Sequence, residues 1–564
     1  MKKLFFGFIF TIILFGAFQV KAATVGDQVI FNINPSYDLN QRNQAVAVLF
    51  KITPRAYFYV DQVWWKSLDF GQQSETVQSL ESLSYDFETK IYPILTQTYG
   101  SEWNPGIDGD SRITILLFLM KEGAQGYFNS ADEYPKSQVS NSNEREMVYL
   151  NVQALNIPNI KIFLAHEFTH LISFNQKERQ YGIREDTWLN EGRAEYAPTL
   201  IGYDSDFQNS NIQRRIKNFM DSKFDSLTEW RDQPYDYGIL NLFTQYLVDY
   251  YGVKILTDSL HSPKTGIESL NEALKTNGFS QDFSQIFTDW TVAIYVNNCQ
   301  VGPKYCYKNP NLKNFRVTPL TNFLPLAGDS VLSTTNRTKD WASNWFKFTG
   351  GRGTLKIDFD GETGSMFKIP YLIESSDGNF TIDFLKLDNF GKGEVIIPDF
   401  GININSITFM PSSQIKTAGF TDSELFRQFS WFVSIVDQAT SSFSPSPTPS
   451  SAIEQLLSQI DVLQKQIAVL RAQLLALTVV QPSISCQKFE NNLYFGLKDN
   501  NEVRCLQEFL KSRGNEIYPG GFITGGFFNF TLEAVKRYQA QKNIIQTGYF
   551  GPLTRTAANQ DLAP

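Results

Sequence analysis

Hydrophobic and polar residues follow different periods in successive parts of the chain. Between residues 23 and 161, stretches such as AVAVLFKI, AYFYVDQVWW and SRITILLFLM are rich in β-branched and aromatic residues, which favours strands. Between residues 162 and 298, apolar positions recur at helical spacing, as in ILNLFTQYLVDYYG and GIESLNEALKTNG. These patterns predict a mixed α/β half followed by a helical half.

Strict alternation replaces the helical pattern after Cys306. The segments GTLKIDFDG, NFTIDFLKL and FSWFVSIVD place apolar residues at every second position, and turns rich in Gly, Asp and Asn separate them. Several short strands of this kind predict a β-sandwich over residues 312–440. The alternating positions are Leu355, Ile357, Phe359, Phe380, Ile382, Phe384, Phe429, Trp431, Val433 and Ile435.

A Pro/Ser linker over residues 441–451 precedes a heptad pattern over residues 452–478. Ile or Leu occupies every core position through four heptads, which favours a parallel two-stranded coiled coil and hence a homodimer. A solitary spacer helix is the alternative, but it would expose an apolar stripe to water. The core positions are Ile453, Leu456, Ile460, Leu463, Ile467, Leu470, Leu474 and Leu477.

The first 22 residues have the organisation of a secretory signal peptide. A positive start at Lys2 and Lys3 leads into an apolar run from Leu4 to Phe18 and a small-residue cleavage site before Ala23. An uncleaved anchor is the alternative, although the run is short for a membrane span. Removing this segment changes the formal charge from -8 to -11, and so acidic a protein is an unlikely nucleic-acid partner.

Four cysteines agree with an exported protein. Pairing within each local pair, Cys299 with Cys306 and Cys486 with Cys505, is the expected arrangement in an oxidising compartment. A cysteine metal site is the alternative, but no CxxC pair occurs.

The segment IFLAHEFTHLISF contains two of the three histidines of the chain. His166 and His170 lie four residues apart and therefore share one face of a helix, where two imidazoles can bind one zinc ion. Glu167 lies one step round the helix, where a carboxylate can accept a proton from water. Two buried structural histidines are the alternative. The third, His261, lies in an apparent turn with no partner motif and is expected on the surface.

The HExxH motif and the downstream segment TWLNEGRAEYA together resemble the gluzincin metallopeptidases. WLNEG is most similar to the aminopeptidase-N-like branch and its hyicolysin-type relatives. The resemblance implies a zincin catalytic domain over residues 23–311, with His166, His170 and Glu191 as zinc ligands and Glu167 as general base. It also implies that Glu195 orients a ligand histidine, although a surface carboxylate is an equal alternative.

Two further features follow from the same resemblance. The segment QPYDYGILNLF is similar to the P-Y-x-x-G stretch that supplies an oxyanion-stabilising tyrosine, which implies Tyr235, with Tyr237 as the second choice. The G-x-M-E-N stretch that binds a free amine in aminopeptidases is missing, and EGAQGYFNSADEY stands in its place. An endopeptidase is therefore expected, with residues 123–128 as the edge strand that binds the peptide.

The last 80 residues contain an internal repeat, TGGFFNFTLEA at Thr524 and TGYFGPLTRTA at Thr547. Together with VRCLQEFL and AVKRYQ, these segments resemble the bacterial peptidoglycan-binding module, a small three-helix unit, over residues 484–560. The resemblance implies attachment to the cell wall. A helical cap without a ligand is the alternative.

The sequence thus predicts a multidomain α+β protein that is exported, associated with the cell wall and active on a protein or peptide substrate as a zinc metallopeptidase. Two other functions stay open: a wall-anchored adhesion or scaffold protein with an inactive peptidase domain, and a hydrolase of peptidoglycan cross-links. Two aspartates in the turn GIDGD, from Gly106 to Asp110, are compatible with calcium, but such residues more often only form the turn.

Overall fold

The computed structural model describes residues 23–155, 157, 159–325, 329–415, 424–436, 488–498, 500–519, 521 and 523–562. The predicted signal peptide, linker and coiled coil lie outside these residues, as does Cys486. The chain divides into two compact units, Met1–Ser442 and Phe443–Pro564. Within the described residues, no helix is long and apolar enough to span a membrane.

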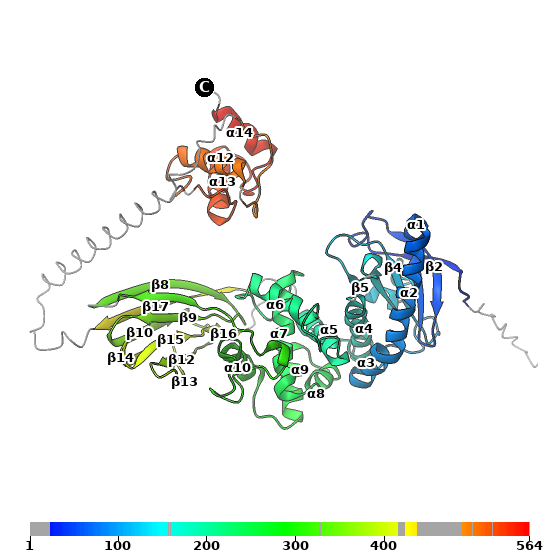
Figure 1. The fold of residues 1–564 in the computed structure, drawn as a ribbon, viewed down its shortest axis with the longest axis horizontal. Helices are drawn as coiled ribbons and strands as arrows, with labels where there is room; N and C mark the ends of the chain where they lie inside the picture. Colours follow the sequence, from blue (N-terminus) through cyan, green and yellow to red (C-terminus); the bar gives the residue numbers. More distant parts are fainter. Residues whose placement is uncertain are drawn as a thin grey trace, which may run out of the picture. The chain divides into compact units, whose positions relative to one another are not determined.

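The first unit begins with a six-stranded mixed sheet (Figure 1). The first three strands pair antiparallel, the central strands β3, β4 and β6 run parallel, and the short strand β5 pairs antiparallel with β6 at the edge. In spatial order the strands are β1 (Gln28–Asn32), β2 (Gln44–Ile52), β3 (Ala56–Asp61), β4 (Ile113–Phe118), β6 (Met147–Asn151) and β5 (Gly126–Phe128).

Both faces of the central strands are buried. Ile115 and Leu117 of β4 face a core that includes helices α2 (Phe70–Asp86), α3 (Tyr92–Tyr99) and α4 (Ile160–Ser173), whereas Leu116 and Phe118 join a second core on the other face. Burial on both faces explains why this strand is a continuous apolar run in the sequence.

The stretch AYFYVDQVWW is a strand only in its first half. Strand β3 ends at Asp61, whose carboxylate accepts hydrogen bonds from the backbone N–H groups of Val63 and Trp64 and so begins helix α1 (Gln62–Ser67). The prediction that the whole stretch is strand is therefore wrong, because an N-capping aspartate interrupts it.

Helices dominate the chain from Ile160 to Val296. A π-helical turn over Phe174–Arg179 extends α4, and Asn297 ends the last helix in the left-handed conformation. After α4 come α5 (Thr187–Ile201), α6 (Asn211–Asp221), α7 (Pro234–Tyr251), α8 (Lys254–Leu260), α9 (Gly266–Thr276) and α10 (Phe283–Val296). The disulfide between Cys299 and Cys306 follows α10 and confirms that predicted pair.

A nine-stranded assembly follows and folds over itself into two layers, which meet where Phe400 pairs with Ile404. Trp431 of one layer packs against Phe348 and Phe409 of the other, with ring centroids 6.1 Å and 4.8 Å apart. The first layer holds β8 (Ser330–Lys339), β17 (Phe426–Val436), β10 (Gly353–Gly361) and β14 (Lys392–Phe400). The second holds β13 (Phe380–Phe384), β12 (Pro370–Ser375), β15 (Ile404–Phe409), β9 (Phe346–Gly350) and β7 (Leu320–Leu324).

Alternation predicts burial in this region for two of the three segments. In β10 and β17 every alternating apolar residue is buried, but in β13 the side chains of Phe380 and Phe384 are 38% and 41% exposed. The difference arises because β13 is an edge strand that pairs with β12 alone.

The sandwich and the helical region share a core. The indole N–H of Trp345 donates to the backbone carbonyl of Thr291 in α10 at 3.0 Å, and Trp341 packs on Phe283, with ring centroids 4.8 Å apart. A buried ion pair of Lys339 with Glu229 and Asp225 adds to this junction. The sandwich therefore packs as part of the first unit.

The second unit explains the internal repeat. Gln507, in α12 (Asn501–Ser512), accepts hydrogen bonds from the N–H groups of Thr524 and Gly525 and donates to the Thr531 hydroxyl. In the second copy, Gln539 accepts from the Gly548 N–H and donates to the Thr554 hydroxyl. Each T-G turn is therefore fastened by a buried glutamine of the preceding helix. The other two helices are α13 (Asn529–Gln541) and α14 (Pro552–Leu562).

Cys505 in α12 is disulfide-bonded, while its predicted partner Cys486 lies outside the described residues.

Candidate metal centre and cleft

Helix α4 is fixed by its apolar residues. Phe168 is fully buried and stacks on Tyr92 of α3, with ring centroids 5.4 Å apart. This packing turns His166, Glu167 and His170 toward a cleft on the opposite side of the helix. The two imidazole Nε2 atoms lie 3.2 Å apart, as the four-residue spacing predicts.

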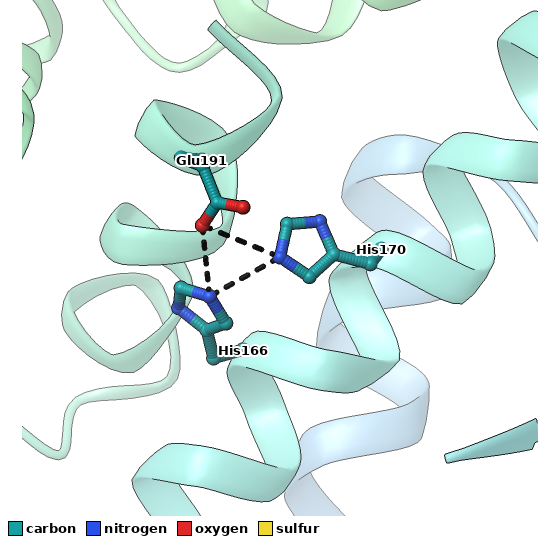
Figure 2. A group of neighbouring side chains, drawn as sticks. All are labelled: His166, His170 and Glu191. Atoms are coloured by element: carbon teal, nitrogen blue, oxygen red, sulfur yellow. Dashed lines mark hydrogen bonds and ion pairs between the residues drawn. The ribbon is translucent and has the colours of Figure 1, made fainter. Parts of the chain in front are cut away.

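Glu191 of α5 completes a group of three donors. Its Oε2 atom lies 3.2 Å from His166 Nε2 and 3.5 Å from His170 Nε2, so that the three side chains converge (Figure 2). Among the described residues, this is the group of histidine, cysteine or acidic side chains whose donor atoms lie within 4.8 Å of one another. The structure thus brings together all three predicted ligands.

The chemistry of this group fits a zinc ion. Two imidazole nitrogens and one carboxylate oxygen are a known catalytic zinc set that leaves a fourth position for water. The position also favours positive charge. Burial alone would lower the pKa of His166, but Glu191 and Glu195 outweigh it and raise this pKa to about 10. Burial would raise the pKa of Glu191, but His170 and His166 lower it to about 2.

Glu195 lies behind His166 and not on the surface. Its Oε1 atom is 3.4 Å from His166 Nδ1, and its side chain is fully buried. Arg215 of α6 binds both carboxylate oxygens, and Asn211 donates to Oε2 at 2.9 Å. Burial would raise the pKa of Glu195, but Arg215 and His166 outweigh it and lower the pKa. The alternative of a surface carboxylate is therefore wrong.

Glu167 faces the cleft beside the edge strand β5. A Cβ atom on Gly126 would lie 3.0 Å from Glu167 Cγ and 2.8 Å from the Tyr149 carbonyl oxygen, so only glycine fits between them. Burial raises the pKa of Glu167. The carboxyl group is thereby disposed to hold a proton, as a group that accepts and delivers one must.

The cleft runs along α4 on both sides of these residues. A cavity of about 230 Å³ extends toward Ser173 and Lys177, and another of about 460 Å³ extends toward Ile162 and Phe163. The two cavities share five lining residues: Tyr37, Gly126, His166, Glu167 and Tyr237. The metal-ligand group therefore lies within a cleft that extends along α4 in both directions.

Of the two candidate tyrosines of α7, the structure places Tyr237 and not Tyr235 beside the metal-ligand group. Tyr237 lines both cavities, and its ring centroid is 6.2 Å from that of His166. Tyr235 lines neither cavity, and the charges that raise the pKa of its hydroxyl, after burial, are those of Asp225 and Asp236. The helix begins at Pro234, and its packing against α6 turns position 237 toward the metal-ligand group.

His261 is half-buried and has a partner. Its Nε2 atom lies 2.9 Å from the Tyr99 carbonyl oxygen, and its own carbonyl accepts a hydrogen bond from the Tyr181 hydroxyl. The turn after α8 therefore packs against the end of α3, and His261 is half-buried where a surface position was predicted.

The two aspartates of the predicted turn bind protein groups. Asp108 accepts from the Asp110 N–H at 2.9 Å, and Asp110 accepts from the Tyr57 hydroxyl at 2.6 Å and from Arg112. Their role in forming this turn accounts for both residues.

Sequence patterns do not identify the residues of α6 that complete the site. Arg215 and Asn211 reach Glu195 only because α5 and α6 both pack against α7. The one available signal is the strong amphipathic pattern of NIQRRIKNFMD, which predicts a helix with one buried face but not what that face contacts.

The comparisons with known proteins agree with two of the resemblances. The family described as "Putative peptidoglycan binding domain" matches residues 499–558, which confirms the C-terminal module. The neutral metalloprotease ShpI of Staphylococcus hyicus is 25% identical over 248 residues, 39% of this chain and 54% of that protein. The chain thus spans about half the length of this curated relative, and the similarity supports a metalloprotease.

Solved structures match only weakly. The pre-peptidase C-terminal domain of collagenase from Bacillus anthracis is 9% identical with a TM-score of 0.15, over 21% of this chain and 98% of that chain. The periplasmic lysozyme inhibitor PliG of Aeromonas hydrophila is 12% identical with a TM-score of 0.13, over 21% of this chain and 99% of that chain. At these scores neither carries an argument about fold or function.

Proposed function

We propose that the protein is an exported zinc endopeptidase of the gluzincin type, held at the cell wall by its C-terminal module. The convergence of His166, His170 and Glu191 within 4.8 Å, beside a buried Glu167 in an open cleft, is the observation that carries this proposal. Similarity to a neutral metalloprotease supports it independently.

The protein groups divide the proposed chemistry among them. His166, His170 and Glu191 hold the metal, and Glu195 keeps the His166 ring in place through Nδ1. When bound, zinc acts as a Lewis acid that polarises the scissile carbonyl and promotes attack by water. Glu167 accepts the proton of the attacking water and delivers it to the leaving amine.

Tyr237 donates a hydrogen bond to the carbonyl oxygen as negative charge develops on it. Its hydroxyl now donates to Asp232 at 3.0 Å, and burial raises the pKa of Tyr237, so the phenol keeps its proton. A positioned neutral donor of this kind is what oxyanion stabilisation requires.

Two observations favour internal cleavage. Cavities extend along α4 on both sides of Glu167, which leaves room for substrate residues on each side of the reacting bond. Strand β5 is the edge of its sheet, where an extended peptide adds as a further strand. Both features suit the backbone of an extended substrate peptide rather than a free amino group.

The test compares the wild type with Glu167→Gln on a mixed peptide library, with zinc content measured in both. The variant keeps its zinc because Glu167 is not a ligand, and it loses turnover by at least about 10²-fold because the proton acceptor is gone. The cleaved bonds must lie inside the peptides rather than next to their free amino ends. Equal activity in both proteins would show that Glu167 is not the base.

A peptidoglycan cross-link hydrolase is the second candidate, favoured by the match of residues 499–558 to a peptidoglycan-binding family. The zinc chemistry is the same, but the substrate is the peptide part of the wall. Release of soluble fragments from purified walls, absent with Glu167→Gln, supports this candidate, whereas cleavage of protein substrates alone supports the first. A scaffold with an inactive domain would show neither activity.

A further inference from the structure

The larger cavity of the cleft contains an arginine that the proposed chemistry does not use. Arg214 of α6 lines the cavity of about 460 Å³, together with His166, Glu167 and Asn218. Its side chain is half-buried, so its guanidinium reaches the cavity from the wall formed by α6.

The contacts of Arg214 leave most of its donors unused. Its NH2 group donates to Asn211 Oδ1 at 2.6 Å, and the guanidinium carbon lies 5.0 Å from the centroid of the Phe163 ring. No carboxylate among the described residues forms an ion pair with it. A guanidinium carries five N–H donors, so it can still bind a carboxylate through two parallel hydrogen bonds.

The neighbouring arginine shows the contrast. Arg215 is already paired with a carboxylate: it donates hydrogen bonds to both oxygens of Glu195, and its guanidinium lies 4.5 Å from the Tyr237 ring centroid. Burial and the charge of Arg215 lower the pKa of Arg214 to about 10, and Glu195 and Asp204 only partly oppose this. Arg214 therefore remains a cation without a full counter-charge at the wall of a substrate cleft.

We propose that Arg214 is a specificity-determining residue that binds a carboxylate of the substrate, either a Glu or Asp side chain or a C-terminal carboxylate. The position, next to the metal-ligand group and on the Phe163 side of Glu167, assigns this preference to one side of the scissile bond. The inference rests on the proposed peptidase function, which it deepens by naming a substrate class.

A carboxylate suits this position better than any other substrate side chain. An apolar substrate side chain there would bury the guanidinium without a partner, which costs free energy, and a basic side chain would add repulsion. A carboxylate instead gains charge-assisted hydrogen bonds that a glutamine of the same shape makes less strongly.

The test uses pairs of fluorogenic peptides that differ only by Glu or Gln at one position, scanned along both sides of the scissile bond. The wild type cleaves the Glu peptide with kcat/KM higher by roughly 10- to 100-fold at one position. Arg214→Gln brings this ratio to near one, and Arg214→Lys keeps part of it. A peptide shortened to end at that position, compared with its amide, distinguishes the C-terminal carboxylate from a side chain.

Lys217→Gln provides the matched control. Lys217 is an exposed cation of the same helix that lines neither cavity, so its removal changes the net charge equally and leaves the ratio unchanged. Melting temperatures verify that each variant folds. Cleavage without a Glu preference at any position, or a preference that survives Arg214→Gln, overturns the inference and leaves the peptidase proposal intact.

A binding measurement separates this inference from failure of the proposed reaction. The anisotropy of the same labelled peptides is measured on Glu167→Gln protein with and without Arg214→Gln. Tighter binding of the Glu peptide that requires Arg214 supports the inference even if the wild type cleaves nothing. Equal binding of both peptides refutes it.

Discussion

His166 Nδ1 lies 3.4 Å from Oε1 of Glu195, and the carboxylate is itself held by Arg215. The two rings of a zinc site bind through one nitrogen each, so the group at the other nitrogen sets the tautomer and the direction of the ring. Here that group is fully buried on the next helix. The direction of His166 is therefore determined by the packing of α4, α5 and α6.

Glu195→Gln tests this relationship. The amide lacks the charge that favours a proton at His166 Nδ1, and it leaves Arg215 buried without a full counter-charge. We expect zinc affinity to fall about 10- to 100-fold, measured by competition with a chromophoric chelator. Glu374→Gln removes a partly exposed carboxylate of the sandwich and is the control. Unchanged zinc affinity in Glu195→Gln would contradict the role given to this residue.

The two tyrosines of α7 give a matched pair of variants. Tyr237→Phe removes a hydroxyl that lies beside the metal-ligand group, and we expect kcat to fall about 10²- to 10³-fold, as for loss of an oxyanion donor. Tyr235→Phe alters a side chain outside both cavities and should leave kcat within about twofold. A larger loss from Tyr235→Phe than from Tyr237→Phe would reverse the assignment.

The convergence of the two histidines could be predicted from local geometry, and that of Glu191 from a resemblance. His166 and His170 are four residues apart on one helix, and WLNEG resembles a motif that places Glu191 on the next one. The faces of α7 cannot be derived in this way. Tyr235 and Tyr237 are two residues apart on a helix whose rotation is set by contacts with α6, so pattern alone cannot say which one meets the site.

The sheets show the same limit. Alternation in β17 predicts burial correctly because both neighbouring strands and an opposite layer cover it, whereas the same alternation in β13 meets solvent at an edge. The order of strands, which local pattern does not contain, decides between these outcomes. Likewise, the continuous run AYFYVDQVWW hides a helix start that only the capping geometry of Asp61 reveals.

Stability of the first unit should depend on buried acids near β6. Burial raises the pKa of Asp132 to about 6, and burial together with Glu146 raises that of Glu133. A raised pKa means that the folded state holds protons that the unfolded chain releases above about pH 4. This contribution to stability is complete below that pH and is lost as the pH rises through about 6 and beyond.

We therefore expect the melting temperature of the first unit to fall between pH 5 and pH 8, measured by calorimetry. Glu133→Gln removes one of two buried like charges, so it should raise the melting temperature at pH 8 and flatten the dependence. Glu75→Gln changes an exposed carboxylate and should do neither. If the melting temperature of Glu133→Gln depended on pH as strongly as that of the wild type, other groups would be responsible for the effect.

Gln507 and Gln539 of the C-terminal module should each stabilise only the turn that they contact. Gln539→Ala leaves the buried Gly548 N–H and Thr554 hydroxyl without their partner, which costs about 1–3 kcal/mol. We expect faster hydrogen exchange in residues 543–551, measured by mass spectrometry on the full chain. We also expect a smaller fraction of the protein to co-sediment with purified cell walls. Exchange near Thr524 should be unchanged, because Gln507 holds that turn.

Gln507→Ala should produce the reciprocal result, with faster exchange in residues 523–527 and protection retained near Gly548. Gln541→Ala, an exposed glutamine at the end of α13, is the control that alters neither turn. Because each glutamine contacts only its own copy of the repeat, the two effects must separate. Simultaneous loss of protection in both turns with either variant would show that the module unfolds as a whole, and that the turns are not held independently.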